Sequence, residues 1–202
     1  YQSPTDMGVN RCGFGIVDDA AVREAGEQEV VRRYFRYACE HVMGLVDRET
    51  VQRLELLMDE LGLAPERRDV VAPAREAAVR AQQKGKGNDG IFCGAALELP
   101  DGSVVTGSNS PLLHASAALV LNAAKRLAGL PRELDLLPPS VIQALGHLKT
   151  EVLGARRVSL DADEALIALA VSATSNPAAD AAVSRLREVR GCEVHMTHMP
   201  TP

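Results

Sequence analysis

The sequence predicts an α/β protein in which a helical N-terminal segment precedes a sheet covered by helices. An apolar run at residues 91–99, turn residues at 100–103 and a short return strand at 104–106 are the pattern of a β-hairpin. In most of the remaining chain, apolar residues recur every three or four positions, as in amphipathic helices. Aromatic residues make up only 3% of the chain. The core must therefore be built from Ala, Val and Leu, which suits helices on a sheet better than an all-β sandwich.

The first 64 residues are predicted to form a turn-rich lead and a helical hairpin, and residues 65–202 the α/β domain. The lead, residues 1–19, contains three closely spaced glycines, Gly8, Gly13 and Gly15. Such glycines can cradle a phosphate, but no P-loop motif and no clear preceding strand accompany them. A structured loop without a ligand is the simpler interpretation, with a phosphate contact as its alternative.

Two helices are expected after the lead. Asp18 or Asp19 caps the first, which ends at Gly44, while Asp47 caps the second and Gly62 ends it. The charged face of the first helix carries Glu and Arg at pairing distance, which indicates a solvated face. Apolar residues line the opposite faces, so we expect the two helices to pack as a hairpin.

The α/β domain is predicted to begin with an Ala-rich helix at residues 73–83. The loop that follows, residues 84–90, is rich in Lys and Gly. A basic lid over an anionic ligand and a mobile surface loop are both compatible with this composition, and the surface loop is favoured.

A polar loop at residues 108–110 connects the hairpin to the next predicted helix. Ser110 has the side chain of an N-cap, Pro111 suits the first helical position and Gly129 suits the C-cap. His114 is therefore expected in the first turn of the helix. Free backbone N–H groups in a first turn favour an anion.

The rest of the chain is predicted to contain two short strands and three helices. An apolar segment at residues 134–137 is interpreted as a strand, and residues 192–199 alternate as a final strand. The first helix is expected at residues 139–153. The second begins at Asp161, with Glu164 as its capping-box partner, and the third runs from Asn176 to Gly191.

Composition excludes several classes of protein. A net charge of -5 gives no general electrostatic reason to bind nucleic acid or an acidic membrane surface. No apolar run is long enough to cross a bilayer, and no signal peptide is recognised. The four cysteines form no CxxC pair, which argues against a zinc knuckle or a disulfide framework and for a reducing cytoplasm. Because the chain begins with Tyr1 rather than Met, we expect a fragment of a longer protein.

From residue 73, the order of helices and strands resembles the cytidine-deaminase-like fold, which implies a three-layer domain with a mixed sheet. In zinc deaminases, the first helix after the hairpin carries His-x-Glu or Cys-x-Glu, and the next opens with Pro-Cys-x-x-Cys. In this chain, the corresponding residues 114–116 read HAS, and residues 139–143 read PSVIQ. Ser116 replaces the catalytic Glu, and Ser140 and Gln143 replace the thiolates. Because a catalytic zinc needs about three protein ligands, neither a zinc site nor zinc-dependent deamination is expected.

Four longer phrases, SPTDMGVN, GFGIVDD, LELPDGSVVTGSNSPLLHASAALVLNA and RGCEVHMTHMPTP, resemble the C-terminal part of a bacterial family, the domain of unknown function eighteen forty-six. That resemblance implies an upstream Gly-rich phosphate-loop-like segment, which this chain lacks. Some members are labelled ATP-dependent peptidases, but the chain contains neither an HExxH helix nor a hydrolase nucleophile motif. The family name supplies no reaction.

His114 is the first candidate catalytic residue. The positive end of a helix dipole disfavours protonation of an imidazole, which suits a neutral donor or a general base. A structural histidine bonded to a backbone carbonyl is an equally weighted alternative. Ser108, Asn109 and Ser110 are candidate ligand-binding residues, although capping alone explains Asn and Ser at a loop-to-helix junction. In a deaminase-like arrangement, the helix starts at Ser110 and Ser140 would converge on one cleft that favours a phosphate or carboxylate.

Two histidines, His195 and His198, lie in the last predicted strand. Residues three apart in a strand point to opposite faces, so a shared metal ion is not expected. His198 is nevertheless a candidate ligand-binding residue of a site completed by another part of the protein. Lys149 and His147, beside an apolar helix face, are interpreted as solvent-exposed.

These observations predict part of a cytoplasmic, homo-oligomeric enzyme that binds a nucleotide-like or phosphorylated small molecule without zinc. His114 would transfer protons, and residues 108–110, Ser140 and His198 would bind the ligand. The alternative is a non-catalytic assembly or regulatory module that kept the fold and lost the chemistry. Loss of every zinc-site residue but one supports that alternative. No cofactor follows from the sequence, and neither nucleic acid nor membrane is an expected partner.

Overall fold

The computed structural model describes residues 18–198 of the 202-residue chain. The chain divides into two compact units, Tyr1–Arg68 and Asp69–Pro202. The glycine-rich segment with Gly8, Gly13 and Gly15 lies outside the described residues. Across residues 18–198, no helix has both the length and the apolar character that crossing a membrane requires.

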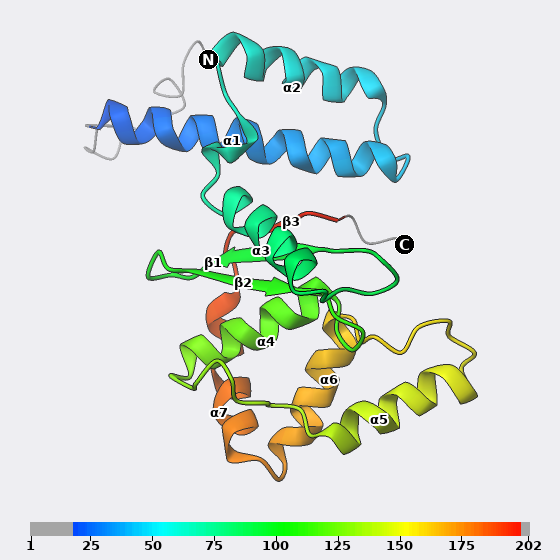
Figure 1. Ribbon diagram of the computed structural model, residues 1–202. Coiled ribbons are helices and arrows are strands. Elements are labelled where there is room, and N and C mark those ends of the chain that lie inside the picture. The colour runs from blue at the N-terminus through cyan, green and yellow to red at the C-terminus, as the bar shows by residue number, and fades with distance from the viewer. Residues whose placement is uncertain (1–17, 199–202) are drawn as a thin grey trace. The chain divides into compact units, whose positions relative to one another are not determined.

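The first unit contains two helices, α1 (Asp19–Val42) and α2 (Arg48–Leu61), followed by the 3-10 turn η3 (Pro65–Arg67) (Figure 1). The two helices pack against each other as the predicted hairpin. Each helix has an apolar stripe, and the buried residues of the two helices are apolar: Val31 of α1, and Val51 and Met58 of α2.

The helix caps of this unit are those that the sequence predicts. The carboxylate of Asp18 accepts a hydrogen bond from a backbone N–H in the first turn of α1, and Asp47 does the same for α2. Gly62, with φ of 62°, ends α2 in the left-handed conformation that glycine adopts readily. On the charged face of α1, Glu29 pairs with Arg33 at 2.9 Å, which confirms the predicted Glu–Arg pairing.

The second unit is built on a three-stranded antiparallel sheet in the order β2-β1-β3. The predicted hairpin is present as β1 (Gly94–Glu98) and β2 (Val104–Ser108), which pair Ala96 with Thr106. The short strand β3 (Val194–Met196) lies antiparallel to the other side of β1. The α/β class is thus confirmed. The described strands are all antiparallel, however, and do not form the expected mixed sheet.

Two helices, α3 (Val71–Gln83) and α4 (Ala115–Leu127), cover opposite faces of this sheet (Figure 1). Gly94 lets α3 approach β1, because an added Cβ would lie 2.0 Å from the carbonyl oxygen of Ala74. Gly107 does the same for α4, where an added Cβ would lie 2.4 Å from a backbone nitrogen. Both helix–sheet contacts therefore depend on a glycine in the strand.

Three further helices pack on or near the far side of α4 (Figure 1). Asp161 and Glu164 form the predicted capping box, and Asn176 caps the last helix as expected. The elements are α5 (Pro139–His147) with its π-helical extension η4 (Leu148–Val152), α6 (Ala162–Ala173), and α7 (Pro177–Arg185) with the 3-10 turn η5 (Leu186–Val189).

The prediction of a strand at residues 134–137 is wrong, because the structure has no strand there. Leu136 and Leu137 are 3% and 5% exposed, and they belong to the apolar core that α4, α6 and α7 share. Both side chains are buried against helices rather than in a sheet. The place beside β1 is occupied by antiparallel β3, which within the described residues is shorter than the predicted strand at residues 192–199.

Candidate functional site

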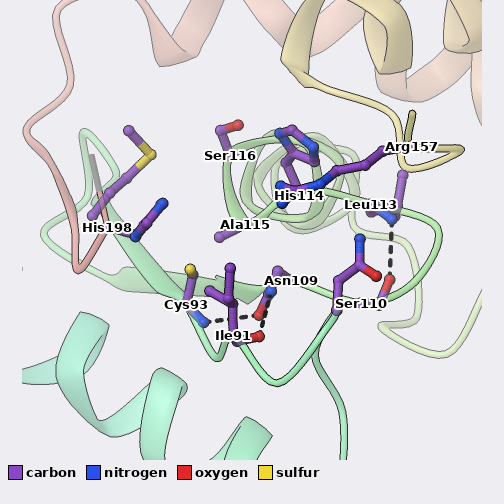
Figure 2. Close-up of a pocket in the computed structure, with 12 residues that line it drawn as sticks. Ile91, Cys93, Asn109, Ser110, Leu113, His114, Ala115, Ser116, Arg157 and His198 are labelled. Carbon is purple, nitrogen blue, oxygen red and sulfur yellow. Dashed lines mark hydrogen bonds between the residues drawn. The ribbon is translucent and has the colours of Figure 1, made fainter. Parts of the chain in front are cut away.

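A small cavity opens where the end of β2, the start of α4 and the segment after β3 meet (Figure 2). Its volume is about 100 Å³. Four of the predicted site residues line it, namely Asn109, Ser110, His114 and His198. Residues that were not predicted to belong to a site complete its wall, among them Ile91, Cys93, Met196, Ser116 and Arg157.

Asn109 is only 7% exposed and uses both ends of its amide on the backbone. Its Oδ1 accepts a hydrogen bond from the N–H of Cys93 at 2.8 Å, and its Nδ2 donates to the carbonyl of Ile91 at 2.9 Å (Figure 2). These bonds tie the end of β2 to the segment that enters β1. The side chain of Asn109 thus shapes the wall of the cavity by fixing two backbone segments.

Ser110 does not begin a helix, contrary to prediction. Its Oγ accepts a hydrogen bond from the N–H of Leu113 at 3.1 Å and so closes a turn. The N–H of His114 donates to the carbonyl of Leu160 at 2.9 Å, so this segment pairs with a distant one instead of coiling. As a result, α4 begins at Ala115, with His114 at its N-cap.

The imidazole of His114 lies against a buried hydroxyl. Its Nε2 is 3.1 Å from Oγ of Ser159, and Ser159 is 1% exposed. When the hydroxyl donates to Nε2, Nδ1 carries the proton and is a donor; in the opposite tautomer Nδ1 is an acceptor. Within residues 18–198, Nδ1 has no partner and is the atom through which His114 can meet a ligand.

Lys149 lies behind this pair, and its side chain is only 15% exposed, contrary to the prediction of a solvent-exposed lysine. Its Nζ donates to the carbonyl of Ser159 at 2.7 Å and to the carboxylate of Glu164 at 2.6 Å. Glu164 also accepts from the N–H of Asp161 within the capping box. The hydroxyl that contacts His114 is therefore held in a fixed segment.

The first turn of α4 presents free backbone N–H groups at the cavity. Those of Ala115, Ser116 and Ala117 have no acceptor in the described part of the chain, and His114 supplies no side-chain cap. Ala115 and Ser116 line the cavity. Unsatisfied N–H groups at the positive end of a helix dipole favour an anion.

Arg157 adds a guanidinium to the same wall (Figure 2). No ion pair or hydrogen bond holds this side chain among residues 18–198, and no Asp or Glu is found among the described residues that line the cavity. A free guanidinium in a wall without carboxylates suits a phosphate or carboxylate ligand. Sequence reasoning missed Arg157, whose only signal was the pair Arg156 and Arg157 in a loop.

The two C-terminal histidines lie in different surroundings. His195 in β3 is 9% exposed and pairs with Ala96, whose side chain belongs to the small core under α3. His198 lies beyond the end of β3 and lines the cavity, at the left in Figure 2, with Arg157 at the right. Only His198 of this pair is therefore positioned to contact a ligand in the cavity.

The remaining predicted residues, Ser108 and Ser140, do not line the cavity. Ser108 lies beside it, in a groove that Asn109 and Ser110 also line. Ser140 is exposed in the first turn of α5 and is found in neither space. Because Ser110 starts no helix, the expected meeting of two helix starts in one cleft is not formed.

Cys93 is 8% exposed, and burial raises the pKa of its thiol. A thiol with a raised pKa is a poor nucleophile at neutral pH. Cys93, His114 and His198 all line the cavity, yet across residues 18–198 no three His, Cys, Asp or Glu side chains are grouped closely enough to hold a metal ion. The groups present offer anion binding and, through His114, proton transfer.

We expect alkylation of Cys93 by iodoacetamide to be slow at pH 7 and to accelerate only above the pH at which an ordinary thiol ionises. The thiolate is the reactive form, and a raised pKa moves its appearance to higher pH. The rate can be followed by peptide mass spectrometry between pH 6 and 10, with an unstructured peptide of the same sequence as control. A midpoint at or below that of the peptide would contradict the raised pKa.

Two family models match the chain. The model described as domain of unknown function DUF1846, C-terminal, covers residues 66–202, and the N-terminal model covers residues 1–62. The sequence resemblance had been assigned to the C-terminal part alone, so the N-terminal match extends it.

Curated relatives cover nearly the whole chain. A UPF0371 protein of Clostridium botulinum is 47% identical over 198 residues, and UPF0371 proteins of Clostridium tetani and Clostridioides difficile are each 44% identical over 197 residues. Each alignment covers 98% of this chain and 39% of the relative. The chain thus spans about two fifths of the length of these relatives.

Proposed function

The chain belongs to the family of the domain of unknown function DUF1846, and from the chemistry of its cavity we propose that it binds a phosphorylated, nucleotide-like small molecule. The name of its relatives, UPF0371 protein, states no reaction. One observation carries the proposal: among residues 18–198, the guanidinium of Arg157 has no partner, no carboxylate lines the cavity, and the free N–H groups of α4 share its wall.

Each group in the wall has a distinct role in this proposal. The N–H groups of Ala115 and Ser116 donate to phosphate oxygens, and Arg157 supplies the charge and a planar pair of donors. His198 adds a further donor at the other side of the cavity. His114 is the candidate catalytic residue, because its Nδ1 can give or take a proton from a bound ligand.

We further propose that the second unit is a variant of the deaminase-like fold that uses no zinc. Its support is the hairpin of β1 and β2 between α3 and α4, together with a histidine at the start of the helix after the hairpin. Ser116 and Ser140 provide neither the acid/base carboxylate nor a thiolate, so the chemistry of the fold would have been replaced by anion binding.

A non-catalytic assembly or regulatory module is the competing function, and one observation favours it. The side chains of Asn109 and Ser110 are engaged by the backbone, so most of the polar loop serves the fold. Under this alternative, His114 and Ser159 form a structural contact only.

We expect the Arg157→Gln variant to bind inorganic phosphate about tenfold or more weakly than the unaltered chain, because a charge-assisted contact contributes about 1.5–3 kcal/mol. Binding can be followed by NMR shifts of the Ala115 and Ser116 amide signals at low ionic strength. The matched control is Arg156→Gln, which removes the same charge from an adjacent, exposed residue that does not line the cavity. The same titration of His114→Ala tests whether the imidazole contacts the ligand.

Equal phosphate affinity in the unaltered chain, Arg157→Gln and His114→Ala would overturn the proposal and favour the assembly module. The ligand itself can be sought by native mass spectrometry of the gently purified full-length protein. A mass excess over the denatured protein that matches a nucleotide or sugar phosphate would identify the ligand class.

A further inference from the structure

A second, larger groove lies beside the cavity in the same unit and shares Asn109, Ser110 and Leu113 with it. Its volume is about 360 Å³, within the range of roughly 300–1,000 Å³ for ligand pockets. The cavity, at about 100 Å³, holds only part of a nucleotide-sized ligand. The groove is therefore a space into which a ligand anchored in the cavity can extend.

The groove is basic although the chain carries a net charge of -5. Four cations line it, namely Arg80, Lys84, Lys86 and Arg132, and Asp135 is the one carboxylate among its described lining residues. Arg80 has an ion-pair partner on its own helix. The side chains of Lys84, Lys86 and Arg132 have no ion pair in the part of the chain that the structure describes. This local excess of positive charge favours a multiply charged anion.

One wall of the groove is the open edge of β2. The pairing of β1 with β2 turns the backbone N–H groups of Thr106 and Ser108 away from β1, toward the groove. Asn122 of α4 donates to the carbonyl of Thr106 at 3.0 Å and interrupts the edge that an added peptide strand would need. Within the described part of the chain, the N–H and hydroxyl donors of Thr106 and Ser108 have no acceptor, which suits a small anion better than a peptide.

We propose that this groove binds a second phosphate group of the ligand held in the cavity, so that the ligand is a small molecule with at least two phosphates. The inference rests on the proposed function for the placement of the first phosphate. Lys84 and Lys86 act as point charges on the second phosphate, and Arg132 contributes its planar pair of donors. Thr106 and Ser108 complete the set of donors from the strand edge.

The test uses inorganic tripolyphosphate as the probe, titrated calorimetrically into the whole chain at low ionic strength. We expect the double variant Lys84→Gln/Lys86→Gln to bind tripolyphosphate about tenfold or more weakly than the unaltered chain. The matched control is Arg187→Gln/Arg190→Gln, which removes two charges from exposed residues of the same unit outside the groove. This control should change the affinity by about twofold or less, because distant exposed charges are screened.

The possible outcomes separate this inference from the proposed function. A loss confined to the lysine variant, with phosphate binding that depends on Arg157, supports both. If phosphate binding depends on Arg157 but the two double variants bind tripolyphosphate equally, the groove is not a phosphate site and only the further inference fails. If phosphate binding is insensitive to Arg157→Gln, the proposed function fails, and with it the assignment of the groove to the same ligand.

Discussion

Replacing Gly94 by alanine is expected to lower the free energy of unfolding of the second unit by about 3 kcal/mol. The new Cβ would lie 2.0 Å from the carbonyl oxygen of Ala74 and 2.5 Å from the backbone nitrogen of Ala78. Both atoms belong to the backbone of α3 and cannot rotate away as a side chain would. The helix must therefore move off β1, which opens the small core that Ala74 forms with Val70 and Ala96.

The loss can be measured by urea denaturation followed by circular dichroism. Gly146→Ala in α5 is the matched control, because its new Cβ meets only the side chain of the exposed Val158 and alanine favours the helix. We expect this control to change the stability by less than about 1 kcal/mol. A Gly94→Ala variant as stable as the unaltered chain would mean that α3 does not approach β1 this closely.

Much of the second unit was predictable because its signals are local. The hairpin follows from an apolar run and the turn residues around Gly102, and the capping box of Asp161 and Glu164 lies within four residues. Asn176 likewise caps α7 from an adjacent position. In each case the residues that specify the structure are also the residues that form it.

Long-range contacts account for the errors. Ser110 and Pro111 have the local features of a helix start, but the pairing of His114 with Leu160 extends the segment and moves the helix start to Ala115. Leu136 is buried in a core formed by helices. No local sequence pattern distinguishes such a residue from one that is buried in a sheet.

The lining of the cavity could be predicted only in part, again because it depends on long-range contacts. His114 was predicted from its place near a helix start, and His198 as part of a site that another part of the protein would complete; both line the cavity. Arg157 lies in a loop without periodicity, and its place in the cavity wall depends on segments far apart in the sequence. Lys149 was misjudged because its partner Ser159 follows a loop that the sequence does not position.

Replacing Asn109 by alanine is expected to lower the free energy of unfolding by about 2–3 kcal/mol, since a buried group left without a hydrogen bond costs about 1–3 kcal/mol. The N–H of Cys93 would lose its acceptor at 2.8 Å, and the carbonyl of Ile91 its donor at 2.9 Å. Cys93 is buried, whereas Ile91 is 37% exposed, so most of the loss comes from the N–H of Cys93. Thermal and urea unfolding of the variant measure this loss.

Ser110→Ala is the matched control, since it removes a hydroxyl next in the chain whose bonds to backbone N–H groups are longer, at 3.1 and 3.3 Å. Its loop is half-buried, so water can replace the hydroxyl and the cost should stay near about 0.5–1 kcal/mol. The comparison also decides between a structural and a ligand-binding role. If Asn109→Ala leaves stability unchanged but weakens phosphate binding, the amide serves the ligand. If stability falls as expected, Asn109 supports the cavity wall through its two bonds to the backbone.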